Sequence, residues 1–157
     1  GFLTGSDIQL EGCNGTLTML ATRDAILPIL AALISAKQSG KTVAEMLSDL
    51  PPRVTASGLI RDFPSELGQA ITKMFAEGGE TVVSKYFGEL FGDCLKLDMT
   101  DGARMTFADG SVVHVRPSGN APEFRCYTEA DTEDAALNNN AKAQAVIINT
   151  LRPLVEA

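Results

Sequence analysis

The sequence is poor in several residue types, and each shortage excludes a class of protein. Tryptophan is absent, and only one histidine and three cysteines occur in 157 residues. The cysteines (Cys13, Cys94 and Cys126) form no CxxC pair, and the histidine, His114, stands alone in a strand-like run. No His/Cys cluster is therefore available to bind zinc. An odd number of thiols without such spacing favours a reduced, cytoplasmic protein.

Long apolar runs and a positive net charge are also missing. No run of about 18 apolar residues occurs, so the sequence predicts no transmembrane helix. The N-terminal GFLTGSD has no basic segment and is not a signal peptide. It also has no initiating methionine, and we expect a processed or truncated chain. The net charge of −7 makes nucleic acid and anionic membranes poor partners. Any anion site must be a local positive spot.

A double proline divides the chain into two parts. Pro51 and Pro52 end a short helix that the capping box from Thr42 to Glu45 predicts. Before it, residues 1–21 read as loop with short strands, and residues 24–38 predict a helix. The apolar side chains of that helix recur at helical spacing: Ile26, Ile29, Leu30, Leu33 and Ile34. We therefore divide the chain into residues 1–50 and 51–157.

Residues 51–157 predict an α+β domain, an antiparallel sheet with helices packed on one face. A strand over 53–61 precedes helical patterns over 65–75 and 80–90. Strand-like runs follow over 94–100, 103–107, 111–117 and 123–130, and the hairpin signals Asp101-Gly102 and Asp109-Gly110 separate the first three. A final helix begins near Asp131, the predicted N-cap. Its predicted buried side comprises Leu137, Ala141, Ile148, Leu151 and Val155.

The loop between the last two strands, VRPSGNAPEFR, concentrates hydrogen-bond donors. Strand alternation places Arg116 on the face opposite Val113 and Val115, so its side chain leaves the sheet at the mouth of the loop. A guanidinium can bind two oxygens of one phosphate or carboxylate. Arg125, at the start of the next strand, adds a second positive charge. The loop is therefore a candidate anion site.

Three further residues of the loop support this hypothesis. Ser118 offers a hydroxyl and Asn120 an amide, while Gly119 permits a positive φ that would gather backbone N–H groups into an anion nest. The alternative is a surface turn whose arginines pair with glutamates, and Glu123 and Glu129 are in reach. The absence of acidic residues between the two prolines of the loop favours an anion site.

The stretch RPSGNAPEFRCYTEA resembles the C-terminal phosphate-binding loop of the α-D-phosphohexomutases, the phosphomannomutase/phosphoglucomutase family. The family form is close to R-P-S-G-T-E-P, followed by a strand ending in E-A. GFLTGSD is similar to the end of the family's sugar-recognition loop, G-G-E-x-S-G-H, and TRDAILPILAAL to the helix after it. The resemblance implies that residues 1–50 are a C-terminal remnant of the third, α/β domain of a four-domain enzyme. Residues 51–157 would then be its fourth domain, with a fold like that of the TATA-box-binding protein.

The resemblance implies a role for individual residues of the phosphate loop. Arg116, Ser118 and Gly119 match it directly, and Asn120 stands where threonine is usual but still donates a hydrogen bond. Ala121 replaces an acidic residue, which makes the loop less negative.

The sugar loop matches less closely. Thr4 stands where a serine contacts sugar hydroxyls, Phe2 where glutamate is usual, and Ser6 where histidine is usual. Thr4 and Phe2 are therefore candidate sugar-binding residues, and the preferred hexose stays open.

Two motifs of the family are missing from this sequence: the catalytic serine loop T-A-S-H-N-P and the D-G-D magnesium loop. TASG at 55–58 lies in a strand-like run without the continuation, and we interpret it as structural. We therefore expect no catalytic residue and no metal ligand here, and no mutase activity from this chain alone. The resemblance implies a full-length phosphohexomutase that interconverts hexose 1-phosphate and hexose 6-phosphate. It would use Mg²⁺ bound outside this chain and glucose or mannose 1,6-bisphosphate as activator and intermediate.

This chain would bind the substrate phosphate that is not reacting. Its expected partners are a hexose phosphate and the N-terminal domains of the same protein. Phosphomannomutase is the first interpretation, and phosphoglucomutase or phosphoglucosamine mutase are alternatives with the same chemistry. A non-catalytic phosphate-binding regulatory module is an alternative of another class. A serine loop and a D-G-D loop in the upstream coding sequence would decide for the enzyme.

Overall fold

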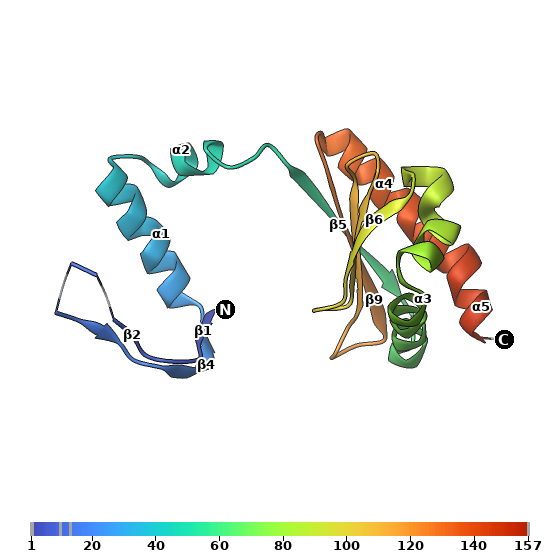
Figure 1. Cartoon of the computed structure of the whole chain (residues 1–157), viewed down its shortest axis with the longest axis horizontal. Helices are drawn as coiled ribbons and strands as arrows, with labels where there is room; N and C mark the ends of the chain where they lie inside the picture. The colour runs from blue at the N-terminus through green and yellow to red at the C-terminus, as the bar shows by residue number, and fades with distance from the viewer. Residues whose placement is uncertain (1, 10, 13, 157) are drawn as a thin grey trace. The chain divides into compact units, whose positions relative to one another are not determined.

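The computed structural model describes residues 2–9, 11–12 and 14–156. They form two compact units, Gly1–Pro52 and Arg53–Ala157 (Figure 1). Cys13 lies outside the described residues, and so do the side chains of Phe2 and Thr4.

The first unit contains four short strands and two helices: β1 (Phe2–Thr4), β2 (Ile8–Gln9), β3 (Thr16–Leu17), β4 (Leu20–Asp24), α1 (Ile26–Ser39) and α2 (Val43–Ser48). β1 pairs with β4 and β2 with β3, both antiparallel. The Asp24 carboxylate accepts hydrogen bonds from the first two N–H groups of α1, and Gly40 ends that helix with a φ of 66°. The predicted capping box of α2 is confirmed.

Helix α1 presents the apolar side chains that its sequence pattern predicts, but the first unit does not cover them. Among the described residues of α1, Ala36 is buried. The larger side chains expose between 48% and 65% of their surface: Ile26, Ile29, Leu30, Leu33 and Ile34. The unit therefore has too few elements to bury its own apolar helix face. That it is the remnant of a larger α/β domain stays a prediction.

The second unit is built on one five-stranded antiparallel sheet, and the predicted α+β fold is confirmed. Its strands are β5 (Val54–Arg61), β6 (Cys94–Asp98), β7 (Ala103–Phe107), β8 (Val112–Pro117) and β9 (Glu123–Ala130). Their order in the sheet is β5-β9-β8-β7-β6. Asp-Gly turns join β6 to β7 and β7 to β8, and Gly102 and Gly110 have φ values of 80° and 84°. The hairpin signals in the sequence are thus confirmed.

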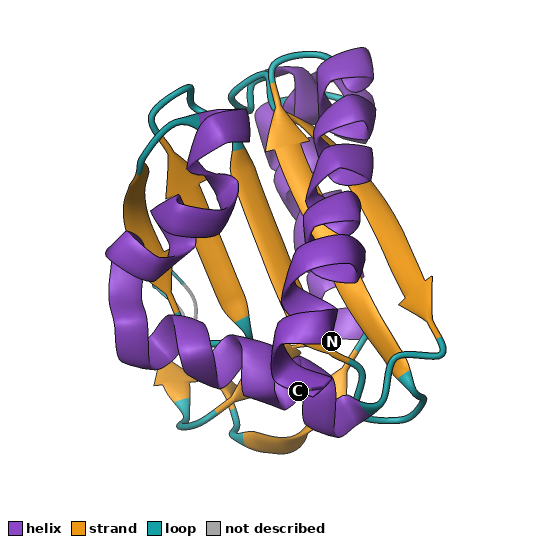
Figure 2. Ribbon diagram, turned by 90° about the vertical axis from the view of Figure 1, so that its right-hand side faces the viewer, coloured by secondary structure: helices purple, strands orange, loops and turns teal. Residues whose placement is uncertain are grey.

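The helices of this unit pack on one face of the sheet (Figures 1 and 2). They are α3 (Ser65–Phe91), α4 (Glu133–Val146), a π-helical turn (Ile147–Leu151) and α5 (Arg152–Glu156). α3 is broken at Gly79, whose φ is 60°, which explains why the sequence shows two helical patterns in this region. No described helix of the unit lies on the opposite side of the sheet, which we call the open face.

The core lies between the sheet and these helices, and six phenylalanines dominate it. Each exposes 1% of its surface or less: Phe63, Phe75, Phe87, Phe91, Phe107 and Phe124. Burying one such side chain contributes about 1.5–3 kcal/mol. Val113 and Val115 of β8 join this core, while His114 and Arg116 lie on the open face. The alternation predicted for this strand is therefore confirmed.

The predicted details of the last helix are wrong in two respects. Thr132, not Asp131, is the N-cap, and its side chain accepts from the N–H of Ala135. Leu137 is also exposed rather than buried, and so are Ala141 and Ile148. Leu151 is buried as predicted and Val155 packs against the core, and the other buried positions are Ala136, Asn140, Ala143 and Ile147.

Close packing of α4 against β5 explains which face of this helix is buried. A Cβ at Gly58 would lie 2.3 Å from both Asn140 Oδ1 and Gln144 Nε2, so these two side chains of α4 occupy the space that the glycine leaves open. Asn140 donates hydrogen bonds to the carbonyl oxygens of Cys126 and Ala56, at 2.9 and 3.4 Å. The π-helical turn then changes the phase of the helix, so a regular 3.6-residue period cannot be extended through it.

Candidate functional site

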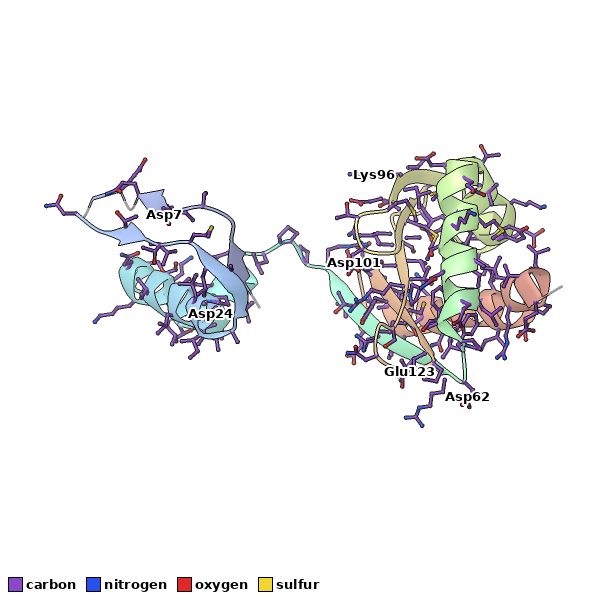
Figure 3. All side chains as sticks on the ribbon, turned by 90° about the horizontal axis from the view of Figure 1, so that it is seen from below. Asp7, Asp24, Asp62, Lys96, Asp101 and Glu123 are labelled. Carbon is purple, nitrogen blue, oxygen red and sulfur yellow. The ribbon has the colours of Figure 1, made fainter. Side chains whose placement is uncertain are left out.

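Three connections meet at one end of the five-stranded sheet. Antiparallel pairing brings these connections together. It sets the start of β7 beside the end of β8, and the end of β8 beside the start of β9. It also sets the start of β9 beside the end of β5. The three connections are the β6–β7 turn (99–102), the β8–β9 loop (118–122) and the β5–α3 connection (62–64). Figure 3 labels Asp101 in the first of them, Asp62 in the third, and Glu123, the first residue of β9 directly after the loop.

The β8–β9 loop is held at its base by the backbone and by α3. The N–H of Ser118 donates to the carbonyl of Glu123, and the N–H of Phe63 donates to the carbonyl of Pro122, both at 2.9 Å. Below the loop, a Cβ at Gly68 of α3 would lie 3.1 Å from Pro117 and 3.0 Å from Phe124. A helix this close under the strands leaves the loop base little room to shift.

The tip of the loop is open, and its base is buried. Ser118 exposes 4% of its surface, and its Oγ accepts from the N–H of Asn120 at 3.5 Å. In this conformation the hydroxyl therefore shapes the turn, with its own proton still available for donation. Gly119 and Asn120 are exposed, and a Cβ at Gly119 would meet nothing within 4 Å. An approaching ligand would therefore meet the N–H groups and the amide of the tip first.

Gly119 does not adopt the positive φ that its lack of a side chain permits. The positive-φ glycines of the described chain are Gly12, Gly40, Gly79, Gly92, Gly102 and Gly110. A nest requires alternating right- and left-handed residues, so it is not formed at the tip. What glycine does supply here is an unobstructed surface at the mouth of the loop.

Two arginines lie side by side on the open face below the loop. Arg116 of β8 pairs in register with Arg125 of β9. Like charges directly opposite each other destabilise a sheet, so a bound anion would relieve their repulsion. Arg116 has one acidic neighbour, because its Nη1 lies 3.5 Å from Oδ2 of Asp101. Among the described residues, no carboxylate lies within ion-pair distance of Arg125.

The N-terminus of α3 adds positive potential beside the loop. Its N-cap, Pro64, has no side chain to accept from the free N–H groups of the first turn. Ser65, the first helical residue, donates its hydroxyl to the carbonyl of Ser118 at 3.3 Å. The positive end of the helix dipole therefore lies next to the loop. Just before it, Asp62 is the one described non-glycine residue with a positive φ, 52°.

The β6–β7 turn completes the site, and hydrogen bonds within it fix its shape. The hydroxyl and the backbone N–H of Thr100 hold the pKa of Asp98 below its ordinary value. Asp101 comes next along the chain and reaches Arg116, as described above. The sequence pattern identified Asp101 and Gly102 only as a hairpin signal, because nothing local connects them with a residue in β8. Strand pairing brings the two segments together.

The structure does not bring all the predicted residues into one site. Arg116, Ser118, Gly119, Asn120 and Arg125 lie on one loop and the two strands it joins. Thr4 and Phe2 belong to the other unit, and their side chains lie outside the described residues. The TASG stretch lies within β5, paired along its length with β9. A binding role for any of these residues stays a prediction.

A concavity of about 340 Å³ lies at the opposite end of the sheet from the β8–β9 loop. It is polar, but its groups are already paired with one another. Arg53 binds Asp131 at 2.5 Å and the carbonyl of Gly110 at 2.8 Å. Ser111 donates to Asp109 and accepts from Asn139. We interpret this cavity as structural.

Neither a metal site nor a membrane helix is found in the described part of the chain. No group of three or more His, Cys, Asp or Glu residues there could hold a metal ion, so the residues present do not fit a magnesium site. None of the helices described is long and apolar enough to cross a membrane.

Comparison with known proteins identifies relatives of this chain. Residues 65–145 match the family described as phosphoglucomutase/phosphomannomutase, C-terminal domain. The chain is 37% identical over 138 residues to a phosphomannomutase of Salmonella muenchen, a match covering 88% of the chain and 28% of that protein. It is 36% identical over 151 residues to a phosphomannomutase of Sinorhizobium fredii (strain NBRC 101917 / NGR234), which covers 96% of the chain and 31% of the relative. The chain thus spans less than a third of the length of these relatives.

Proposed function

The chain belongs to the phosphoglucomutase/phosphomannomutase family, and from this premise we propose that it binds the phosphate group of a hexose phosphate at the β8–β9 loop. The observation that carries the proposal is the pairing of Arg116 with Arg125 at the mouth of that loop. Two adjacent guanidinium groups match a dianionic group with several oxygens better than they match one carboxylate. The N-terminus of α3 and the donors of the loop tip add to the same local potential.

In the complete protein, we propose a phosphomannomutase-type reaction that interconverts hexose 1-phosphate and hexose 6-phosphate. The phosphate bound at this loop is the one that does not react. Binding energy from such a remote group positions the reacting end of the substrate. Loss of Arg116 in the complete enzyme should therefore lower kcat as well as raise KM.

We assign the catalytic serine and the Mg²⁺ ligands to other parts of the complete protein. The 1,6-bisphosphate intermediate would form there as well. No step of the reaction is assigned to the residues described above. The chain alone should accordingly bind phosphate without turnover. A cytoplasmic location remains part of the proposal and rests on the odd number of cysteines and their lack of CxxC spacing.

Titration of the chain with three ligands, followed by amide chemical shifts, tests this function. Inorganic phosphate and mannose 6-phosphate should both move the signals of Ser118, Gly119 and Asn120, and mannose without phosphate should not. Movement with mannose alone would show a sugar site in place of a phosphate site. If the three signals stay still while another surface responds to phosphate, this loop is the wrong assignment.

The choice between a mutase and a non-catalytic phosphate-binding module depends on residues beyond this chain. The family membership and the 36–37% identity to two phosphomannomutases favour the mutase. Activity of the complete protein on mannose 1-phosphate, glucose 1-phosphate and glucosamine 1-phosphate would decide among the sugars. Lack of turnover on all three, with phosphate binding retained, would favour the module.

A further inference from the structure

We propose that Asp101 is a positioning residue for the phosphate site. Its carboxylate holds the guanidinium of Arg116 at the mouth of the β8–β9 loop before the anion binds. The inference rests on the proposed function, in which Arg116 is the main anchor. Three contacts between the β6–β7 turn and β8 support the proposal. They involve the backbone of Gly102, the ring of His114 and the carboxylate of Asp101.

The first contact sets the turn directly on the backbone of β8. Gly102 has a φ of 80°, a conformation that side chains rarely adopt. A Cβ at this position would lie 2.3 Å from the carbonyl oxygen of Val115 and 2.6 Å from the Cβ of Arg116. The turn therefore touches the strand at the root of the arginine side chain. This contact fixes where Asp101 sits relative to Arg116.

The second contact holds the backbone of Asp101. The Nε2 of His114 lies 2.5 Å from the carbonyl oxygen of Asp101. Because a carbonyl oxygen only accepts, Nε2 must carry a proton and donate it. The imidazole is itself supported by the ring of Tyr127, with centroids 5.7 Å apart. This role of the lone histidine is structural and does not depend on its charge.

The third contact reaches the guanidinium. Oδ2 of Asp101 lies 3.5 Å from Nη1 of Arg116. It engages one terminal nitrogen and leaves Nε and Nη2 free to bind two oxygens of an anion. A long side chain that is oriented before binding loses less rotamer entropy when the ligand arrives.

Two electrostatic effects compete at this contact. The negative charge of Asp101 repels an incoming anion, but its side chain is 69% exposed, so water and salt screen that repulsion. Against this, Arg125 lies opposite Arg116 and repels its guanidinium. The attraction of Asp101 opposes this repulsion and holds the guanidinium of Arg116 in place. The turn that carries Asp101 is itself fixed by the contacts of Gly102 and His114 described above. We therefore infer that orientation outweighs repulsion.

A double-mutant cycle on the whole chain tests the proposal, with inorganic phosphate as the probe. Asp101→Ala should weaken phosphate binding three- to tenfold in the wild-type background and cause no further loss in an Arg116→Ala background. Asp101→Asn, which keeps an oxygen acceptor, should retain more affinity than Asp101→Ala. Asp109→Asn removes one negative charge at the other Asp-Gly turn and should leave the affinity unchanged. Without phosphate, the Nε–H signal of Arg116 should be broader in Asp101→Ala than in the wild type, and it should sharpen more in the variant on saturation with phosphate.

Unchanged or tighter phosphate binding by Asp101→Ala would overturn the proposal, and so would equal losses in both backgrounds. A general loss of folding would appear in the Asp101→Asn spectrum as movement of signals far from the turn and would count against a local role. If Arg116→Ala itself binds phosphate normally, the proposed function fails, whatever Asp101 does. Failure of the positioning role alone leaves Arg116→Ala defective.

Discussion

At the scale of single residues, the site depends on which side chains share a face of the sheet. The sequence predicts Arg116, Ser118 and Asn120 because they stand together in one loop. It predicts Arg125 because strand alternation and the short loop bring that residue back beside Arg116. Asp101 is missed, since it reaches Arg116 from a turn fifteen positions earlier, through the pairing of β7 with β8. A conformation such as the φ of Gly119 is likewise decided by the hydrogen bonds that hold the loop base.

Cys126 gives a prediction at this scale. Burial raises the pKa of its thiol from 9.0 to about 12. Since the folded-state pKa is the higher one, the folded chain keeps its proton where the unfolded chain ionises. The free energy of unfolding should therefore be fully maintained below pH 9 and fall as the pH rises from 9 towards 12, by up to about 1.4 kcal/mol per pH unit.

Urea unfolding of the wild type and of Cys126→Ala at pH 7, 9 and 10 measures this effect. Other groups titrate in the same range, so the difference between the two proteins isolates the thiol. The stability difference should shrink above pH 9. A difference that stays constant from pH 7 to 10 would show that Cys126 is not kept neutral by burial.

At the scale of elements, the sequence predicts the strands and their turns well and the buried face of α4 poorly. Strand alternation and Asp-Gly turns are local signals: β7 and β9 alternate along their whole length, and Asp-Gly turns join β6 to β7 and β7 to β8. The buried face of α4 is decided instead by how closely the helix approaches Gly58 of β5. Small residues and a hydrogen-bonded Asn140 suit that approach, so the large side chains of the helix face outward. Apolar periodicity alone points to the opposite choice.

The two Asp-Gly turns provide a matched comparison. Gly102→Ala and Gly110→Ala both place a side chain at a positive φ, which costs about 1–2 kcal/mol. Only Gly102→Ala also drives a Cβ into the backbone of β8, whereas Gly110 faces open space. Gly102→Ala should therefore destabilise the chain by about 1–3 kcal/mol more than Gly110→Ala in urea unfolding. Equal destabilisation would mean that the turn does not press on β8.

Two substitutions in α4 test its buried face. Leu137→Ala should change the free energy of unfolding by less than about 0.5 kcal/mol, because the side chain is 55% exposed. Ala143→Leu should cost about 1–3 kcal/mol, because it overpacks a fully buried position. Urea midpoints of the two variants decide the matter. A larger loss of stability in Leu137→Ala than in Ala143→Leu would show that α4 buries the face that carries Leu137, as its sequence pattern predicts.

At the scale of the whole molecule, the chain consists of two units with very different cores. The second unit buries six phenylalanines between its sheet and its helices, while the apolar residues of α1 in the first unit stay about half exposed. The sequence predicts this contrast, because residues 24–38 show an apolar helix face and the first fifty residues offer few elements to cover it.

Hydrogen exchange of the whole chain measures the contrast between the units. Amides of α1 should exchange faster than those of β7 and β8, because local opening of α1 exposes little additional apolar surface. The loss of protection on adding denaturant should also occur earlier in the first unit. Equal protection of the two units in a monomeric sample would contradict this account.

The central claim is that Arg116 anchors a bound phosphate. The most direct test is to measure phosphate affinity by NMR titration for the wild type, Arg116→Ala and Arg104→Ala. Arg104 lies on the same open face but pairs with Glu129 at 3.0 Å, so it controls for general loss of positive charge. A charge-assisted contact contributes about 1.5–3 kcal/mol, so Arg116→Ala should bind phosphate about ten- to a hundredfold more weakly. Arg116→Lys should recover part of that loss, because lysine keeps the charge without the fork. Equal affinities of Arg116→Ala and Arg104→Ala would contradict the claim.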